Sequence, residues 1–138
     1  MMGVRFVQVL DLFKNPALWS AFLSWLVAQI VKMVIYKSPK RMLSYGGMPS
    51  AHTATVTGLA WMVGRITGFD SVAFAIAGIF FVVVVTDAVR LRGTVERLAL
   101  TVNEKLGTNH RSEIGHNLRE VFVGFLIGTV VAWLMPKW

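Results

Sequence analysis

With 138 residues the chain has room for one domain, and its hydrophobic content of 55% excludes an ordinary soluble domain of this size. Charged residues make up 15% of the chain, against about 25% in a typical soluble protein, so we expect an integral membrane protein. The net charge of +7 comes from bases near the ends of apolar segments, which favours anionic lipid headgroups over nucleic acid as partners. The chain has no cysteine, which excludes disulfides and thiolate ligands.

The apolar segments predict an all-α bundle in which four helices span the membrane and amphipathic helices lie at its surface. Residues 1–14 and 94–106 show amphipathic spacing, so each is expected to be a surface helix. Spanning helices need about 20 residues to cross a bilayer of about 30 Å. They are expected at 17–36, 51–67, 71–89 and 119–135. We therefore expect a multi-pass protein of a cell membrane or of a plastid-type inner membrane.

The first span carries Gln29 and Lys32 in its last third. Polar side chains at that depth are costly, so they are expected to face the protein interior or a wet cavity. The alternative for Lys32 is that its ammonium group reaches the membrane surface, as long side chains near helix ends often do. The loop that follows carries Lys37, Lys40 and Arg41, which is typical of a cytoplasmic loop.

The stretch Gly-Gly-Met-Pro-Ser-Ala-His at 46–52 joins the first two spans. Ser50 is expected to be the N-cap of the second span, with Ala51 and His52 as its first helical residues. Backbone N–H groups and the positive end of the helix dipole then lie beside an imidazole, an arrangement that suits phosphate. The plain alternative is a loop-to-helix junction with an interfacial histidine.

Two features predict how the spans pack. The first half of 51–67 is rich in threonine and small residues, which a lipid-facing helix would not be, so this helix is expected at the centre of the bundle. Gly124 and Gly128 in the last span form a GxxxG pair, which favours close helix packing.

The alternating direction of four spans brings the ends of the first and third spans and the starts of the second and fourth to one membrane face. That face collects Lys32, His52, Asp87, Arg90, Arg92, His116 and Glu120. His116 and Glu120 are four residues apart, so on a helix they share a face, where a carboxylate fixes the tautomer of an imidazole. Such a histidine is a good nucleophile or base, whereas the plain alternative is a surface ion pair.

A metal site is a further alternative for His52, His116, Glu120 and Asp87, because two imidazoles and two carboxylates can bind zinc or iron. However, the neighbouring bases would repel a cation, and no tight ligand spacing such as HExxH is present. We therefore expect neither a metal nor another cofactor. His110 lies in the expected loop 105–115 and is assigned no role.

The residues at 46–54, Gly-Gly-Met-Pro-Ser-Ala-His-Thr-Ala, closely resemble the GGMPSSHSA signature of the divergent PAP2 family. These are small membrane proteins related to acid phosphatases and vanadium haloperoxidases. Further matches follow in the same order: Gln29 and Lys32, Asp87-Ala88, Arg92, Asn103, and Gly115-His116 with Glu120-Val121. The chain departs from the family pattern at Asn117, where threonine is usual, and at Arg90-Leu91-Arg92, which replaces Gly-Val-Arg. Arg90 is therefore the alternative to Arg92.

The resemblance implies a metal-independent phosphatase acting on a lipid phosphate or diphosphate, such as phosphatidic acid, phosphatidylglycerophosphate or a prenyl diphosphate. It implies that His116 attacks phosphorus to form a phosphohistidine, that Glu120 orients it, and that His52 protonates the leaving oxygen and then activates water. The residues implied to hold phosphate are Lys32, Arg41, Ser50 and Arg92 or Arg90, with Gln29, Asp87 and Gly47 in support.

Two functions of other classes stay open. The chain could be a lipid-binding or phosphate-binding membrane protein without activity, since it departs from the spacings of the wider PAP2 motifs. It could also be a small transporter or an ion-conducting homo-oligomer, which short spans with Lys32 and Asp87 inside them allow. Phosphate release and ion flux separate these functions.

Overall fold

The computed structural model describes residues 11–39, 46–110 and 115–137. All regular elements in these ranges are helical, so the predicted all-α fold is confirmed. They are the 3₁₀ turn η1 (Leu12–Lys14), α2 (Pro16–Tyr36), α3 (Ala51–Thr67), α4 (Val72–Thr86), the π-helical turn η3 (Asp87–Leu91), α5 (Arg92–Leu106) and α6 (Leu118–Leu134). Most of the amphipathic helix expected at 1–14 lies outside the described residues.

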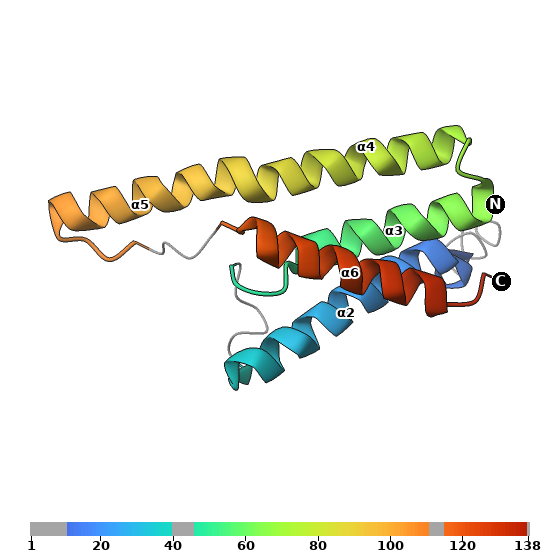
Figure 1. Ribbon diagram of the computed structural model, residues 1–138, viewed down its shortest axis with the longest axis horizontal. Helices are drawn as coiled ribbons and strands as arrows, with labels where there is room; N and C mark the ends of the chain where they lie inside the picture. Colours follow the sequence, from blue (N-terminus) through green and yellow to red (C-terminus); the bar gives the residue numbers. More distant parts are fainter. Residues whose placement is uncertain (1–10, 40–45, 111–114, 138) are drawn as a thin grey trace, which may run out of the picture.

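Helix α3 is the centre of the bundle, as its small and polar residues predict. Helices α2, α4 and α6 each pack against it (Figure 1). The GxxxG pair of α6 faces α3, where a Cβ atom on Gly124 or Gly128 would overlap the α3 backbone. The hydroxyl of Ser20 in α2 donates a hydrogen bond of 2.8 Å to the carbonyl of Gly58 in α3. Small residues thus let three helices approach closely, as they do in membrane proteins.

The third expected span and the expected surface helix form one continuous rod. The sequence predicts a spanning helix over 71–89 and a separate surface helix over 94–106, but α4, η3 and α5 run without interruption from Val72 to Leu106. Gly93 lies between the two predicted helices, but a glycine in a helix interior costs only about 1 kcal/mol, which a long helix tolerates. As a result, α5 continues the axis of α4 well beyond the other helices (Figure 1).

The polar and apolar side chains are distributed as lipid requires. The buried residues between the helices include Ser20, Ser24, Gln29, Lys32, Thr53 and Thr57. The exposed face of α4 is apolar, and Ile76 and Ile79 are each 67% exposed. Water-soluble domains show the reverse pattern. Within the described ranges, two helical segments are long and apolar enough to cross a membrane, Pro16–Tyr36 with a mean hydropathy of 1.7 and Val72–Leu106 with 2.5.

Candidate active site

The start of α6 holds a carboxylate in a fixed position. Asn117 is the N-cap, and its side-chain oxygen accepts a hydrogen bond of 2.9 Å from the backbone N–H of Glu120. In return, the Glu120 carboxylate accepts hydrogen bonds from the backbone N–H of Asn117 at 3.3 Å and from its side-chain amide at 3.2 Å. This reciprocal arrangement is a capping box. Asn117 therefore serves as a helix cap at the position where the family pattern has threonine, another good cap.

The same carboxylate holds the ring of His116. Oε2 of Glu120 lies 2.8 Å from Nδ1 of His116, whose side chain has 0% exposed surface. The backbone N–H of His116 donates to the carbonyl of Ala88 at 3.1 Å. Because Nδ1 faces a carboxylate, we assign the proton of a neutral ring to Nδ1, which leaves a lone pair on Nε2. Nε2 is buried and has no hydrogen-bond partner among the described residues.

His52 lies close to this pair, in the first turn of α3. The centroids of the His52 and His116 rings are 6.3 Å apart. The backbone N–H of Ser50 donates to the carbonyl of Glu120 at 3.0 Å, which ties the start of α3 to the start of α6. Ser50 is the N-cap, as predicted, and its hydroxyl oxygen accepts from the backbone N–H of Thr53 at 3.3 Å. Two capped helix starts therefore bring both histidines together.

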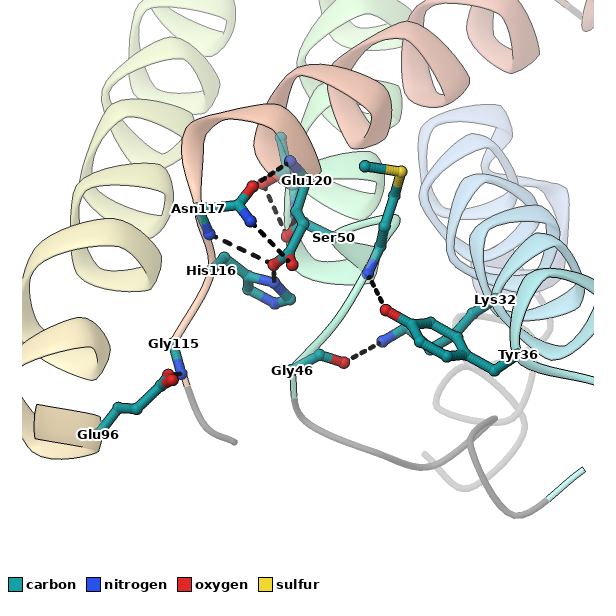
Figure 2. Close-up of polar contacts among 11 residues, drawn as sticks. Lys32, Tyr36, Gly46, Ser50, Glu96, Gly115, His116, Asn117 and Glu120 are labelled. Atoms are coloured by element: carbon teal, nitrogen blue, oxygen red, sulfur yellow. Dashed lines mark hydrogen bonds and ion pairs between the residues drawn. The ribbon is translucent and has the colours of Figure 1, made fainter. Parts of the chain in front are cut away.

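Helix α2 contributes a buried base. Lys32 is 1% exposed, so of its two alternatives the structure shows the interior one, and its ammonium group donates to the carbonyl of Gly46 at 3.1 Å. The hydroxyl of Tyr36 accepts from the backbone N–H of Met48 at 3.1 Å. Figure 2 shows Lys32 and Tyr36 reaching from α2 toward the loop that contains Gly46. One turn earlier, Gln29 is also buried.

Gly47 is required by the conformation of this loop. Residues with a side chain rarely adopt its backbone φ of +89°, and a Cβ atom there would lie 2.7 Å from the hydroxyl of Tyr36. The flexible diglycine of the sequence is thus a tight turn against α2. Arg41, also assigned to phosphate binding, lies outside the described residues.

The π-helical turn η3 positions Asp87 and Arg92. The backbone N–H of Arg92 donates to the carbonyl of Asp87, five residues earlier, and Nε of Arg92 lies 2.9 Å from a carboxylate oxygen of Asp87. In an α-helix, residues five apart point about 140° away from each other, so the wider π turn allows this ion pair. Arg90 is exposed. Of the two alternatives for the phosphate-binding arginine, Arg92 is therefore the one held near His116.

The electrostatic surroundings keep His116 neutral. Burial lowers the pKa of the His116 imidazole, the hydrogen bond and charge of Glu120 raise it, and the positive charges of Lys32 and Arg92 lower it. The net effect is a pKa below the ordinary value of 6.5. Because the lowered pKa disfavours the charged ring, His116 carries a free lone pair at neutral pH, as a nucleophile requires.

Some contacts of the site were not predicted from the sequence. The carboxylate of Glu96 in α5 accepts a hydrogen bond of 2.9 Å from the backbone N–H of Gly115. A Cβ atom on Gly115 would overlap the backbone of Gly93, so these two glycines allow the chain at Gly115 to approach α5 closely. A pocket of about 290 Å³ lies beside His116, and Glu96 and Arg97 form part of its wall. The spacing Asn-x-x-Glu at 117–120 is the one signal that could have predicted a cap here.

Two further residues singled out in the sequence, His110 and Asn103, pair with each other at the end of α5. His110 is exposed, and its backbone is held by Asn103, whose amide donates to the carbonyl of His110 at 2.8 Å. Asn103 therefore stabilises the turn after α5. Among the described residues, no three His, Asp or Glu side chains are grouped so that they could hold a metal ion.

The fold and the site together define a small helical protein of membrane character, with two histidines, a carboxylate, a buried lysine and a partly buried arginine at one end of its bundle. The chain belongs to the divergent PAP2 family, whose family model matches residues 13–131. It is similar to the "Uncharacterized membrane protein YuiD" of Bacillus subtilis (strain 168), with 28% identity over an alignment of 153 positions that covers 91% of this chain and 97% of that protein. No solved structure matches the chain significantly.

Proposed function

We propose that the chain is a multi-pass membrane phosphatase that removes a phosphate or diphosphate group from a lipid. The observation that carries this proposal is the state of His116, whose Nδ1 is held by Glu120 while Nε2 has no hydrogen-bond partner in the part of the chain that the structure describes. A surface ion pair would need neither the burial nor the second histidine nearby. The substrate classes are those that the family resemblance suggests: phosphatidic acid, phosphatidylglycerophosphate or a prenyl diphosphate.

In the proposed reaction Nε2 of His116 attacks phosphorus, the bond from phosphorus to the leaving oxygen breaks, and a phosphohistidine forms. Protonated His52 donates its proton to the leaving oxygen. Neutral His52 then takes a proton from water, the oxygen of which attacks phosphorus and breaks the bond to nitrogen. The two rings, 6.3 Å apart between centroids, are near enough to act on one phosphoryl group. Inorganic phosphate leaves, and both histidines return to their starting state.

The bases of the site neutralise the charge of the phosphoryl group. Lys32 and Arg92 are close enough to His116 to affect its pKa, so they are the described bases best placed for this role. Arg41 is proposed to join them. Phosphoryl transfer depends mostly on positioning and charge neutralisation, so cationic side chains can do this without a metal ion.

The proposed topology has α2, α3, the α4 part of the rod and α6 all crossing the membrane. Helices α3 and α6 have 17 residues each, near the lower limit for a spanning helix of about 17 residues. The apolar exposed face of α6, with Phe122, Leu126 and Val130, supports its contact with lipid. The site then lies at the depth of the lipid headgroups. Self-association stays a prediction.

Phosphate release by the purified protein in detergent tests the proposal. The substrates are phosphatidic acid, phosphatidylglycerophosphate, a prenyl diphosphate and a soluble phosphomonoester, each measured with EDTA and with vanadate. We expect release that survives EDTA, stops with vanadate and is lost in His116→Ala. His110→Ala is the matched control, because its side chain is exposed and only its backbone is bonded. Vanadate binding without release from any substrate would instead indicate a phosphate-binding protein.

A further inference from the structure

An apolar groove lies between α4 and α6, with one end at the start of α6. It has a volume of about 580 Å³ and is lined by residues of α4 and α6 that include Phe81, Leu118, Phe122 and Phe125. Leu118 lies two residues after His116 in the chain, so the groove opens at the level of the site. Helices α4 and α6 both pack against α3 rather than mainly against each other, which leaves the groove between them.

A second apolar cavity continues the groove deeper into the bundle. This cavity, of about 150 Å³, is lined by residues that include Trp61, Phe74 and Gly78, and it shares Phe81 and Phe125 with the groove. The rings of these two shared phenylalanines have their centroids 6.1 Å apart. Both cavities together form the α4–α6 groove, which has one aromatic pair at its middle.

The length of the α4–α6 groove indicates what it can hold. Its lining runs along α6 from Leu118 to Phe125 and along α4 from Phe81 to Phe74, with the Phe81–Phe125 pair where the two stretches meet. Each stretch covers seven residues, so the two together correspond to roughly 21 Å of helix. One leaflet of a bilayer has a hydrocarbon depth of about 15 Å, half of the usual total. The groove therefore reaches beyond the middle of the bilayer.

We propose that the α4–α6 groove binds one long hydrocarbon chain of the lipid phosphate, an inference that rests on the proposed function. Apart from Arg119 and Thr57, its lining residues are apolar in both cavities. Its upper end is at Leu118, two residues after His116, so a phosphate at His116 and an attached chain in the groove fit one molecule. Its depth favours lipids with long acyl or prenyl chains. Such a site holds a substrate by its tail and positions its phosphate for attack.

Gly78→Leu tests this by filling the inner cavity. A Cβ atom on Gly78 meets no atom within 4 Å, so the new side chain enters open space. We expect kcat/KM for a long-chain lipid phosphate to fall about tenfold or more, since hydrophobic contacts of this size discriminate at that level. A short-chain version of the same lipid should be hydrolysed as before. Ile76→Phe, which enlarges a side chain that is 67% exposed on α4, is the matched control. Equal loss for both chain lengths would overturn the proposal.

Photocrosslinking keeps the test independent of catalysis. A lipid phosphate with a diazirine in its chain should label α4 and α6 around Phe81 and Phe125, and Gly78→Leu should reduce this labelling while Ile76→Phe leaves it unchanged. A phosphatidylcholine with the same diazirine is the comparison lipid, and equal labelling by it would overturn the proposal by indicating a general lipid contact. Selective labelling without phosphate release would refute the phosphatase and retain the groove as a lipid-phosphate site.

Discussion

The starts of α3 and α6 are both stabilised by an N-cap side chain, but they hold their histidines differently. Both helices begin with a polar N-cap, Ser50 in α3 and Asn117 in α6, and the two starts are joined by the hydrogen bond from Ser50 to the carbonyl of Glu120. His116 is fixed through its backbone and through Nδ1, whereas Nδ1 of His52 is buried without a partner among the described residues.

This difference matches the two tasks that phosphohistidine chemistry requires. A nucleophile must present one nitrogen in one tautomer, and contacts to Ala88 and Glu120 provide that constraint for His116. A general acid and base must exchange a proton with the leaving group and then with water. His52, close to His116 and less constrained, suits that second task.

The largest effect is expected from His116→Ala. Without a nucleophile the covalent step cannot occur, so phosphate release should fall by about 10³-fold or more for every substrate. Release is measured with a lipid phosphate and with an aryl phosphate, and His110→Ala should match the wild type. Circular dichroism in detergent checks that the helices persist. Activity within a few-fold of the wild type would remove His116 from the chemistry.

His52→Ala sharpens the comparison, because its effect should depend on the leaving group. General acid catalysis contributes about 10²–10⁴-fold. We expect a loss of that size for a lipid phosphate, because its leaving alkoxide needs a proton. For an aryl phosphate, which has a good leaving group, the loss in the first step, formation of the phosphohistidine, should be much smaller. Burst kinetics with the aryl phosphate measure that step. An equal loss for both substrates in this step would contradict the assigned role.

Glu120→Gln separates the charge of the carboxylate from its role as a cap. Glutamine can also complete a capping box, so the free energy of unfolding should change by less than about 1 kcal/mol. The imidazole loses the negative charge that supports it, and we expect kcat to fall about 10–100-fold. Glu120→Ala should lose similar activity and also unfold at a lower temperature. Thermal unfolding in detergent, measured alongside activity, distinguishes the two variants.

The pH profile should show that His116 is held neutral. Its pKa is lowered, so the ring becomes protonated only below the ordinary value of 6.5, and the acidic limb of kcat/KM assigned to His116 should lie below that pH. Since Glu120 raises this pKa, Glu120→Gln should move the limb to lower pH still. The lowered pKa of His116 also makes the folded protein less stable as the pH falls below 6.5. In that range the imidazole binds a proton more readily in the unfolded chain than in the folded one. An acidic limb above 6.5 that Glu120→Gln shifts would contradict this assignment.

The smallest effect is expected from Tyr36→Phe, which acts on the loop before α3. This change removes the hydroxyl that accepts from the backbone N–H of Met48, a hydrogen bond worth about 1 kcal/mol. The loop before α3 should loosen, and we expect KM to rise a few-fold with little change in kcat. Steady-state kinetics measure both values. A large fall in kcat would show that Tyr36 acts in the chemistry rather than on the loop.

Local signals allowed part of this arrangement to be predicted from the sequence. Ser50 as a cap follows from Pro-Ser before a helical run, and the central place of α3 follows from its threonines and small residues. The continuity of the rod could not be predicted, because Gly93 and the polar residues around it resemble a helix end. The position of the Lys32 side chain could not be predicted either. The same sequence allows it to face the interior or to reach the membrane surface, and only the packing of α2 on α3 distinguishes the two.

Contacts between segments far apart in the chain could not be predicted from the sequence. The hydrogen bond from Gly115 to Glu96 and that from His116 to Ala88 depend on where the chain returns to the rod. The π turn gives no clear sequence signal either, because a helix in which residues bond five apart differs from an ordinary one by a small local shift. Its presence is evident only once Asp87 and Arg92 are seen to pair.

That turn decides where in the rod a residue can be lost without changing the direction of the side chains after it. Each residue removed from a regular α-helix rotates everything after it by about 100°. A π turn holds one residue more than an α turn, so deleting one residue between Asp87 and Leu91 would return the turn to ordinary α-helical winding and leave Arg92 and Glu96 facing the same way. Deleting one residue between Arg92 and Glu96 would instead swing Glu96 around the axis, away from Gly115, while the rod stays about as long and as apolar. Single-codon deletions are therefore expected to be tolerated at η3 and at the far end of α5, and not between Arg92 and Glu96.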